Sequence, residues 1–365
     1  MKIFLKSILL IISACLFSQA LEAQQQITGR ITNATDGTPI QYAYVIISNS
    51  TIGTRSDESG NYSLTVQGNG SFEIAVSYIG YQSVIHKVDA PQPFHQYNVA
   101  LEVSELPEVV VNARVNYRRS DVNLFWEALL GERPSINGME VLNADKAYFY
   151  LNSDNVLKVS CKEPIEVINH YTGYHIRYIL ESFEHDYSSN STTFHGAPYF
   201  EELISQNRLQ KDRWERTRQA VYAVSINRFM RALYREQIHE NGFLLLDRDS
   251  LFAQKISLPA LENILQPYND RTQLNIEIPL YLMCYAKPVT EEMIKSSIHR
   301  DNYGRFPIVE LEPQQITIYQ DGTYTGLLTI REHQSSISRL SALLPVEYGQ
   351  TAELGEIEND TSIQD

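Results

Sequence analysis

Four of the nine histidines lie close together in the sequence, at His170, His175, His185 and His195. Imidazole nitrogens are common zinc ligands, and three of them around an open position would make a metal centre able to activate water. The residues around these histidines alternate between apolar and polar types, which is typical of β-strands. We therefore expect them to lie separately on strand surfaces, and we expect no metal and no other cofactor.

The sequence lacks the motifs of several hydrolase classes. A zinc carboxypeptidase needs a His and a Glu three residues apart plus a distant His, but no His-x-x-Glu pair occurs. The nearest match, His86 with Asp89, falls on a predicted strand where both side chains cannot share a face. His-Glu-x-x-His, Gly-x-Ser-x-Gly and P-loop motifs are also missing. A glycosidase carboxylate pair remains open, because tertiary geometry alone brings such a pair together.

Three arginines, Arg228, Arg231 and Arg235, share one face of a helix predicted over 211–240. Apolar residues recur there at spacings of three and four, and Asn241-Gly242 is a C-terminal stop signal. Such a cluster can bind a phosphate or carboxylate. The alternative, which we expect, is a solvated face whose arginines pair with acidic neighbours.

Tyrosine is frequent, with 23 in the chain. Many of them fall in 148–199, namely Tyr148, Tyr150, Tyr171, Tyr174, Tyr178, Tyr187 and Tyr199. Tyrosine gives rigid amphipathic contact area that suits recognition of a protein or glycan. Half-buried tyrosines in strands are the alternative, and we expect them here.

Composition describes an acidic globular protein. The 365 residues carry a net charge of −14, with 43% hydrophobic and 20% charged residues. The acidity argues against nucleic acid or an anionic membrane surface as the main partner. Domains of ~100–200 residues are usual, so two are expected.

Residues 1–23 have the pattern of a secretory signal peptide. Lys2 and Lys6 precede an apolar run over 8–17, and small residues follow it. This run is shorter than the ~20 residues that cross a membrane. We therefore expect an exported protein in the periplasm, the outer membrane or at the cell surface. A lipoprotein acylated at Cys15 is the less favoured alternative.

The mature chain has two cysteines, Cys161 and Cys284. An oxidising compartment would permit a disulfide, but two cysteines without a CxxC spacing are weak evidence for one. We expect buried free thiols.

Period-two alternation dominates residues 24–101, as in Phe72, Ile74, Val76 and Tyr78. Short strands of this kind, separated by turns, predict an antiparallel β-sandwich. The turn Asp57–Gly60 can be capped by its carboxylate and closed by its glycine. Calcium binding by Asp57, Glu58 and Asn61 is less favoured, since no cage of six oxygens is evident.

Several segments of 24–101 resemble the carboxypeptidase regulatory-like domain, namely 27–31, 36–40, 57–64 and 77–81. The resemblance implies a transthyretin-like sandwich without catalytic residues. Similar domains precede the plug in TonB-dependent receptors of the starch-utilisation type.

The segment 102–119 is expected to be a linker. Within it, 106–113 (LPEVVVNA) resembles a TonB box, which acts by strand addition to a partner sheet. Only about 250 residues follow, too few for a 22-stranded receptor barrel with strands of ~9–11 residues and a plug. A connecting strand is therefore the favoured interpretation.

Residues 120–345 are predicted to form a mixed α+β domain. We expect a helix over 121–130 with Ser120 as N-cap, a hairpin of 174–180 with 192–195, an alternating strand over 274–282, and a hairpin turning at Asp321-Gly322. Pro279 suggests an edge or bulge in the 274–282 strand. Motifs up to about residue 245, among them 162–165 (KEPI), 194–196 (FHG) and 231–234 (RALY), resemble the C-terminal region of short exported carboxypeptidase-like regulatory domain-containing proteins. The acidic segment 346–365 is expected to be a disordered tail.

Three functions are compatible with these patterns. The favoured one is a non-enzymatic cell-envelope protein that binds a protein or glycan partner. The second is an envelope peptidase or glycosidase with its site in 120–345. The third is an accessory component of a TonB-linked uptake system.

Overall fold

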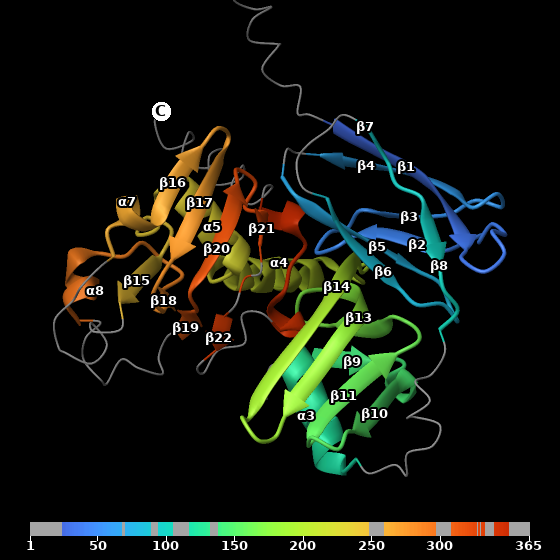
Figure 1. Cartoon of the computed structure of the whole chain (residues 1–365). Coiled ribbons are helices and arrows are strands. Elements are labelled where there is room, and N and C mark those ends of the chain that lie inside the picture. The colour runs from blue at the N-terminus through green and yellow to red at the C-terminus, as the bar shows by residue number, and fades with distance from the viewer. Residues whose placement is uncertain are drawn as a thin grey trace, which may run out of the picture.

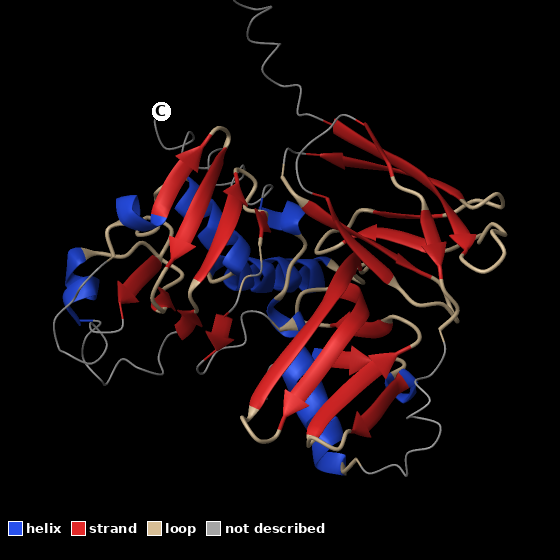
Figure 2. Ribbon diagram, in the orientation of Figure 1, coloured by secondary structure: helices blue, strands red, loops and turns tan. Residues whose placement is uncertain are grey.

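The computed structural model describes residues 24–67, 70–88, 94–104, 117–131, 138–247, 259–296, 308–326, 328, 330–332 and 339–349. Strands predominate, and they form three lobes around central helices (Figures 1 and 2). The signal-like segment 1–23 with Cys15, the segment 106–113 and the tail beyond 350 lie outside the described residues. No helix of the described part is long and apolar enough to cross a membrane.

The first lobe, called the sandwich, spans residues 24–104 and confirms the predicted β-sandwich, but one of its two sheets mixes antiparallel with parallel strand pairs. Its strands are β1 (Gln24–Asn33), β2 (Tyr44–Ile47), β3 (Gly53–Arg55), β4 (Asn61–Gln67), β5 (Phe72–Ser77), β6 (Val84–Val88), β7 (Phe94–Gln96) and β8 (Val99–Leu101). One sheet has the order β4-β1-β7, with β8 also on β1, and the other has the order β3-β2-β5-β6. The inward-facing side chains of these strands, such as Ile27, Leu64 and Ile74, fill the space between the two sheets.

The turn at Asp57 is built as the sequence predicts. The Asp57 carboxylate Oδ1 accepts hydrogen bonds from the backbone N–H groups of Ser59 (2.9 Å) and Asn61 (2.8 Å). Gly60 has φ +80°, which a side chain would disfavour. The carboxylate therefore serves the turn itself.

Pairing continues beyond the predicted end of the sandwich at residue 101. Tyr81 forms an antiparallel bridge with Val103, and Ser104 N donates to Gly80 O at 2.8 Å. The first residues of the predicted linker therefore belong to the sandwich.

The second lobe, called the sheet lobe, holds a six-stranded sheet with the helix α3 (Arg119–Leu130) packed on it. Its strands are β9 (Met139–Val141), β10 (Ala147–Leu151), β11 (Val156–Cys161), β12 (Ile165–Asn169), β13 (Tyr174–Asp186) and β14 (Ser191–Glu202), with the 3-10 turn η3 (Ala144–Lys146). The order is β10-β11-β13-β12-β9, and β14 pairs with β13 as the predicted hairpin.

Helix α3 begins earlier than predicted. The N-cap is Arg118, and the carboxylate of Asp121 accepts from the Arg118 backbone N–H at 2.7 Å. Ser120 instead lies inside the helix. The acidic side chain at the third helical position reaches back to the backbone N–H of the N-cap residue, as in one half of a capping box.

The prediction of a single long helix over 211–240 is wrong. The structure has α4 (Arg208–Ala223) and α5 (Ile226–Tyr234), separated at Val224 and Ser225. Ser225 Oγ accepts from the Arg228 backbone N–H, so Ser225 caps a new helix. The break lets α4 pack on the sheet lobe while α5 enters another core.

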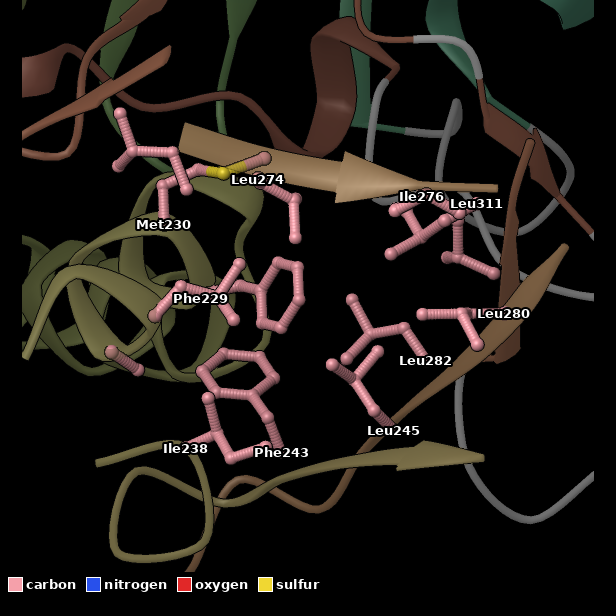
Figure 3. Packing of buried hydrophobic residues seen from close by; sticks show 14 of the residues in the cluster. Phe229, Met230, Ile238, Phe243, Leu245, Leu274, Ile276, Leu280, Leu282 and Leu311 are labelled. Carbon is pink, nitrogen blue, oxygen red and sulfur yellow. The ribbon is translucent and has the colours of Figure 1, made fainter. Parts of the chain in front are cut away.

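The third lobe, called the C-terminal lobe, contains α5 and two four-stranded sheets, ordered β15-β18-β19-β22 and β16-β17-β20-β21. Its elements are β15 (Phe243–Asp247), α7 (Leu261–Ile264), β16 (Leu265–Tyr268), β17 (Arg271–Ile276), β18 (Leu280–Cys284), α8 (Glu291–Ser296), β19 (Ile308–Leu311), β20 (Gln314–Tyr319), β21 (Tyr324–Thr325) and β22 (Ile330–Glu332). Figure 3 shows Phe229 and Met230 of α5 packed against strand residues such as Phe243, Leu274 and Leu282.

One predicted strand is divided in two. Residues 274–276 belong to β17 and residues 280–282 to β18, which lie in different sheets, and Pro279 lies in the connection between them. Proline has no N–H for a ladder, so the chain leaves the first sheet there. The predicted hairpin at Asp321-Gly322 is confirmed, with Tyr319 N donating to Thr323 O at 2.9 Å.

The described part of 120–345 therefore contains two large, separate hydrophobic cores and a smaller buried cluster around Leu244 and Met283. Residues 339–349, called the closing segment, return to the sheet lobe through Leu340, Leu344 and Tyr348. The prediction of a disordered tail is wrong for residues 346–349, which are helical and partly or fully buried. Tyr348 of this helical turn enters the core of the sheet lobe.

Candidate functional site: a cleft enclosed by three lobes

A cleft of about 1540 Å³ lies where the three lobes meet. Its walls come from the sandwich (47–52, 65–66 and 70–73), from the β13–β14 hairpin, and from the C-terminal lobe with the closing segment. Hydroxyl side chains that are at least partly exposed contribute to the lining, including Thr51, Thr65, Thr193, Thr323 and Tyr324. Such a lining suits a ligand with many hydrogen-bonding groups.

The sandwich joins the sheet lobe by strand-like pairing. Asn49 N donates to Pro198 O at 2.7 Å, and Phe200 N donates to Ser50 O at 3.0 Å. Beside these bonds, Ile46 and Ala75 of the sandwich pack on Ile179 and Ala197 of the sheet lobe. This contact fixes one corner of the cleft with both apolar burial and backbone bonds.

The sandwich also touches the C-terminal lobe. Ser71 Oγ donates to Tyr324 O at 3.4 Å, and a Cβ added to Gly70 would lie 2.1 Å from the Thr323 hydroxyl. The absence of a side chain at Gly70 therefore allows the two lobes to approach closely. This second contact joins the sandwich to the C-terminal lobe at another corner of the cleft.

Arg231 connects the remaining walls. Its side chain is 2% exposed and donates to three neutral acceptors: Asp321 O (2.8 Å), the Tyr222 hydroxyl (2.8 Å) and Val346 O (2.9 Å). These acceptors belong to the β20–β21 turn, α4 and the closing segment. The prediction of a solvated arginine face is wrong for Arg231, whose guanidinium is satisfied by carbonyl and hydroxyl oxygens within the fold.

The closing segment places a buried carboxyl group in the cleft wall. Glu347 Oε1 accepts from Thr51 N at 3.1 Å and from the Thr51 hydroxyl at 3.4 Å. Burial raises the pKa of Glu347 above its ordinary value. The bond ties the closing segment to the sandwich loop and so closes the third corner.

Charged groups at the rim are paired between lobes. Glu73 of β5 lies opposite Lys87 in the sandwich, and its Oε1 is 3.8 Å from His195 Nε2 of β14. His195 Nδ1 also contacts the Glu181 carboxylate. Exposed pairs of this kind contribute little to stability, so they leave the rim adaptable.

The four clustered histidines do not converge. Three of them pair with different carboxylates: His170 with Glu140, His175 with Glu166 and Glu201, and His195 with Glu73 and Glu181. His185 is buried, which contradicts the expected strand-surface position, and its Nδ1 lies 2.7 Å from the Thr192 hydroxyl. Burial lowers the pKa of His185. Within the described ranges, no three His, Cys, Asp or Glu side chains are placed to hold a metal ion.

The other predicted features have structural explanations. Tyr174 and Tyr178 are buried in the sheet lobe, and Tyr178 also lines the cleft. Cys161 and Cys284 are free thiols, as expected, and burial raises the pKa of each to about 12. Sequence reasoning missed the cleft, because its walls come from segments between residues 47 and 349 and no local motif marks them.

Comparison with known proteins agrees with the sandwich. Residues 27–111 match the family model of the CarboxypepD_reg-like domain. No curated protein matches the chain. The match includes residues 102–104, which the structure also pairs with the sandwich.

Solved structures resemble the chain only weakly. A mutant type II cohesin–X-dockerin complex from Acetivibrio cellulolyticus has 14% identity, 20% coverage of this chain, 51% coverage of its own and a TM-score of 0.19. Catechol 1,2-dioxygenase from an Acinetobacter species has 15% identity, 28% coverage of this chain, 59% coverage of its own and a TM-score of 0.20. A DUF3823 family protein from Bacteroides ovatus has 8% identity, 50% coverage of this chain, 82% coverage of its own and a TM-score of 0.19.

The chain thus spans about half of the cohesin–dockerin chain that it matches. TM-scores this low carry no conclusion about function.

Proposed function

We propose that this chain is an exported, non-enzymatic binding protein of the cell envelope whose cleft takes a protein or glycan partner. The observation that carries the proposal is the closed ring of three lobes around a large cleft lined by hydroxyl groups. Its volume exceeds the ~300–1,000 Å³ of ordinary small-molecule sites, which favours a polymeric ligand. Export rests on the signal-like pattern of 1–23.

Four carboxylates line the cleft, on Glu73, Glu312, Asp321 and Glu347, and the contacts of three of them support a binding role over hydrolysis. Asp321 Oδ1 accepts from both the backbone N–H and the hydroxyl of Thr323, at 2.9 and 2.7 Å. Glu347 binds Thr51, and Glu73 faces His195. A glycosidase needs two carboxyl groups free to face a substrate across a cleft, whereas these three serve turns and lobe contacts.

A matched pair of substitutions tests the cleft. Thr65 and Ser63 are exposed on the same face of β4, and only Thr65 lines the cleft. Residues 24–365 would be screened against an oligosaccharide array and a random peptide library. We expect Thr65→Trp to weaken binding of the selected ligand about tenfold, or ~1.4 kcal/mol, while Ser63→Trp leaves it unchanged.

Two results would overturn the proposal. One is that neither library yields a ligand. The other is that both tryptophan variants bind the selected ligand as tightly as the unaltered chain, which would place its site outside the cleft.

The accessory role in TonB-linked uptake rests on 106–113, which lies outside the described residues. Deletion of 105–113 leaves the paired residues 102–104 in place. Unchanged association with envelope partners after this deletion would exclude the accessory role.

A further inference from the structure

Strand β14 has an open edge in the cleft. One side of it pairs with β13 along its whole length, and within the described residues the other side pairs only with the sandwich loop, through the bridge of Ser50 with Tyr199. Residues 191–196 of β14 all line the cleft. Among the described residues, their outer N–H and C=O groups form no hydrogen bond with another backbone group.

The direction of these groups follows from strand geometry. The outward bonds at Pro198 O and Phe200 N identify the even-numbered residues as those whose backbone points away from β13. Because strand residues alternate, Thr192, Phe194 and Gly196 also point their N–H and C=O groups outward. The extra residue at the bulge between Leu180 and Ser182 is on β13, so the alternation along β14 continues.

The same edge already accepts an added segment. Asn49 and Ser50 lie parallel to Pro198–Phe200 with hydrogen bonds of 2.7 and 3.0 Å. The edge is therefore neither twisted away nor blocked by its side chains at that end. A second extended segment could continue the pairing along 192–196, over about 13 Å at ~3.4 Å per residue.

We infer that the free edge of β14 binds an extended polypeptide segment of a partner protein by strand addition. This inference rests on the proposed binding function of the cleft and names its ligand class. A polypeptide repeats N–H and C=O groups at the spacing that the edge presents, and the resulting bonds give affinity largely independent of sequence. A glycan has no such repeat, so it could bind the hydroxyl groups but not match the edge.

Proline substitution tests this edge without breaking the sheet. The N–H of Thr192 points outward, so a proline there removes a donor to the ligand but no bond to β13. Thr192 also bonds His185 through its hydroxyl. Thr192→Val is the matched control, because it loses the same hydroxyl and keeps the N–H.

The probe is a dye-labelled peptide selected from a random twelve-residue library displayed on phage, and binding is measured by fluorescence polarisation on residues 24–365. We expect Thr192→Pro to weaken binding at least tenfold and Thr192→Val less than threefold. Circular dichroism would show that both variants are folded. Amide exchange at Thr192, Phe194 and Gly196 should slow at least tenfold when the peptide binds.

The outcomes separate this inference from the proposed function. A peptide that is sensitive to Thr65→Trp but binds Thr192→Pro normally, without slowing the three amides, would refute strand addition and leave the cleft as the site. Selection of glycans but no peptides would refute the polypeptide ligand. Failure to obtain any cleft-dependent ligand would refute both.

Discussion

Replacing Arg231 by methionine should loosen the joint between the lobes. The guanidinium is 2% exposed and satisfies Asp321 O, the Tyr222 hydroxyl and Val346 O. Each buried acceptor left without a donor costs about 1–3 kcal/mol. Methionine keeps most of the volume and removes a buried charge, which offsets part of that loss. We expect a net destabilisation of about 3 kcal/mol.

Arg228→Met is the internal control for this prediction. Arg228 lies on the same helix, is half-buried, and makes one long bond of 3.4 Å to Ala223 O. Its replacement should cost less than about 1 kcal/mol. Arg231→Lys is expected to fall between the two variants, because one ammonium cannot reach three acceptors arranged for a planar fork.

The assay is urea unfolding of residues 24–365, followed by circular dichroism and by limited proteolysis at low urea. Several lobes need not unfold in one step, so the midpoint of the first transition is the quantity compared. The bonds of Arg231 hold the walls of the cleft, so we expect Arg231→Met to shift the first transition and to expose the closing segment to protease. Equal midpoints for the methionine variants of Arg231 and Arg228 would refute this reasoning.

Two further predictions concern ionisable groups. Burial raises the pKa of Glu347, so the folded state binds its proton more tightly than the unfolded state, and stability falls as pH rises above the ordinary value of 4.5. Glu347→Gln should therefore gain stability relative to the unaltered chain between pH 4.5 and 7 in urea unfolding, and a pH-independent difference would contradict the raised pKa. Burial also raises the pKa of the Cys161 and Cys284 thiols to about 12. Both should react slowly with a thiol reagent at pH 8 when native and rapidly in urea, and fast native reaction would show that they are accessible thiolates.

Much of the sandwich follows from local sequence. The alternation of Phe72, Ile74 and Val76 sets the inward face of β5 regardless of what lies elsewhere in the chain. The turns at Asp57 and Asp321 use a carboxylate and a glycine a few residues apart, so the chemistry that closes them is contained in the turn. Such features depend on neighbours in sequence and can be predicted from it.

Other features depended on what each segment packs against. Helical periodicity runs through Ser225, yet the helix breaks there because α4 and α5 belong to different cores. Likewise, the alternation of 274–282 is continuous, but its two halves join different sheets on either side of Pro279. Periodicity reports that a side of a segment is apolar, and it does not report which core that side enters.

The candidate site depends wholly on what distant segments pack against. Sequence predicted an exported acidic protein with a β-sandwich and an α+β region, and it favoured a binding role over catalysis. It gave no sign that Arg231 would be buried or that Thr51 would bind Glu347, 296 residues away. The cleft exists because three separately packed lobes close into a ring. Contacts between residues so far apart in the chain leave no local pattern, so only the tertiary structure decided them.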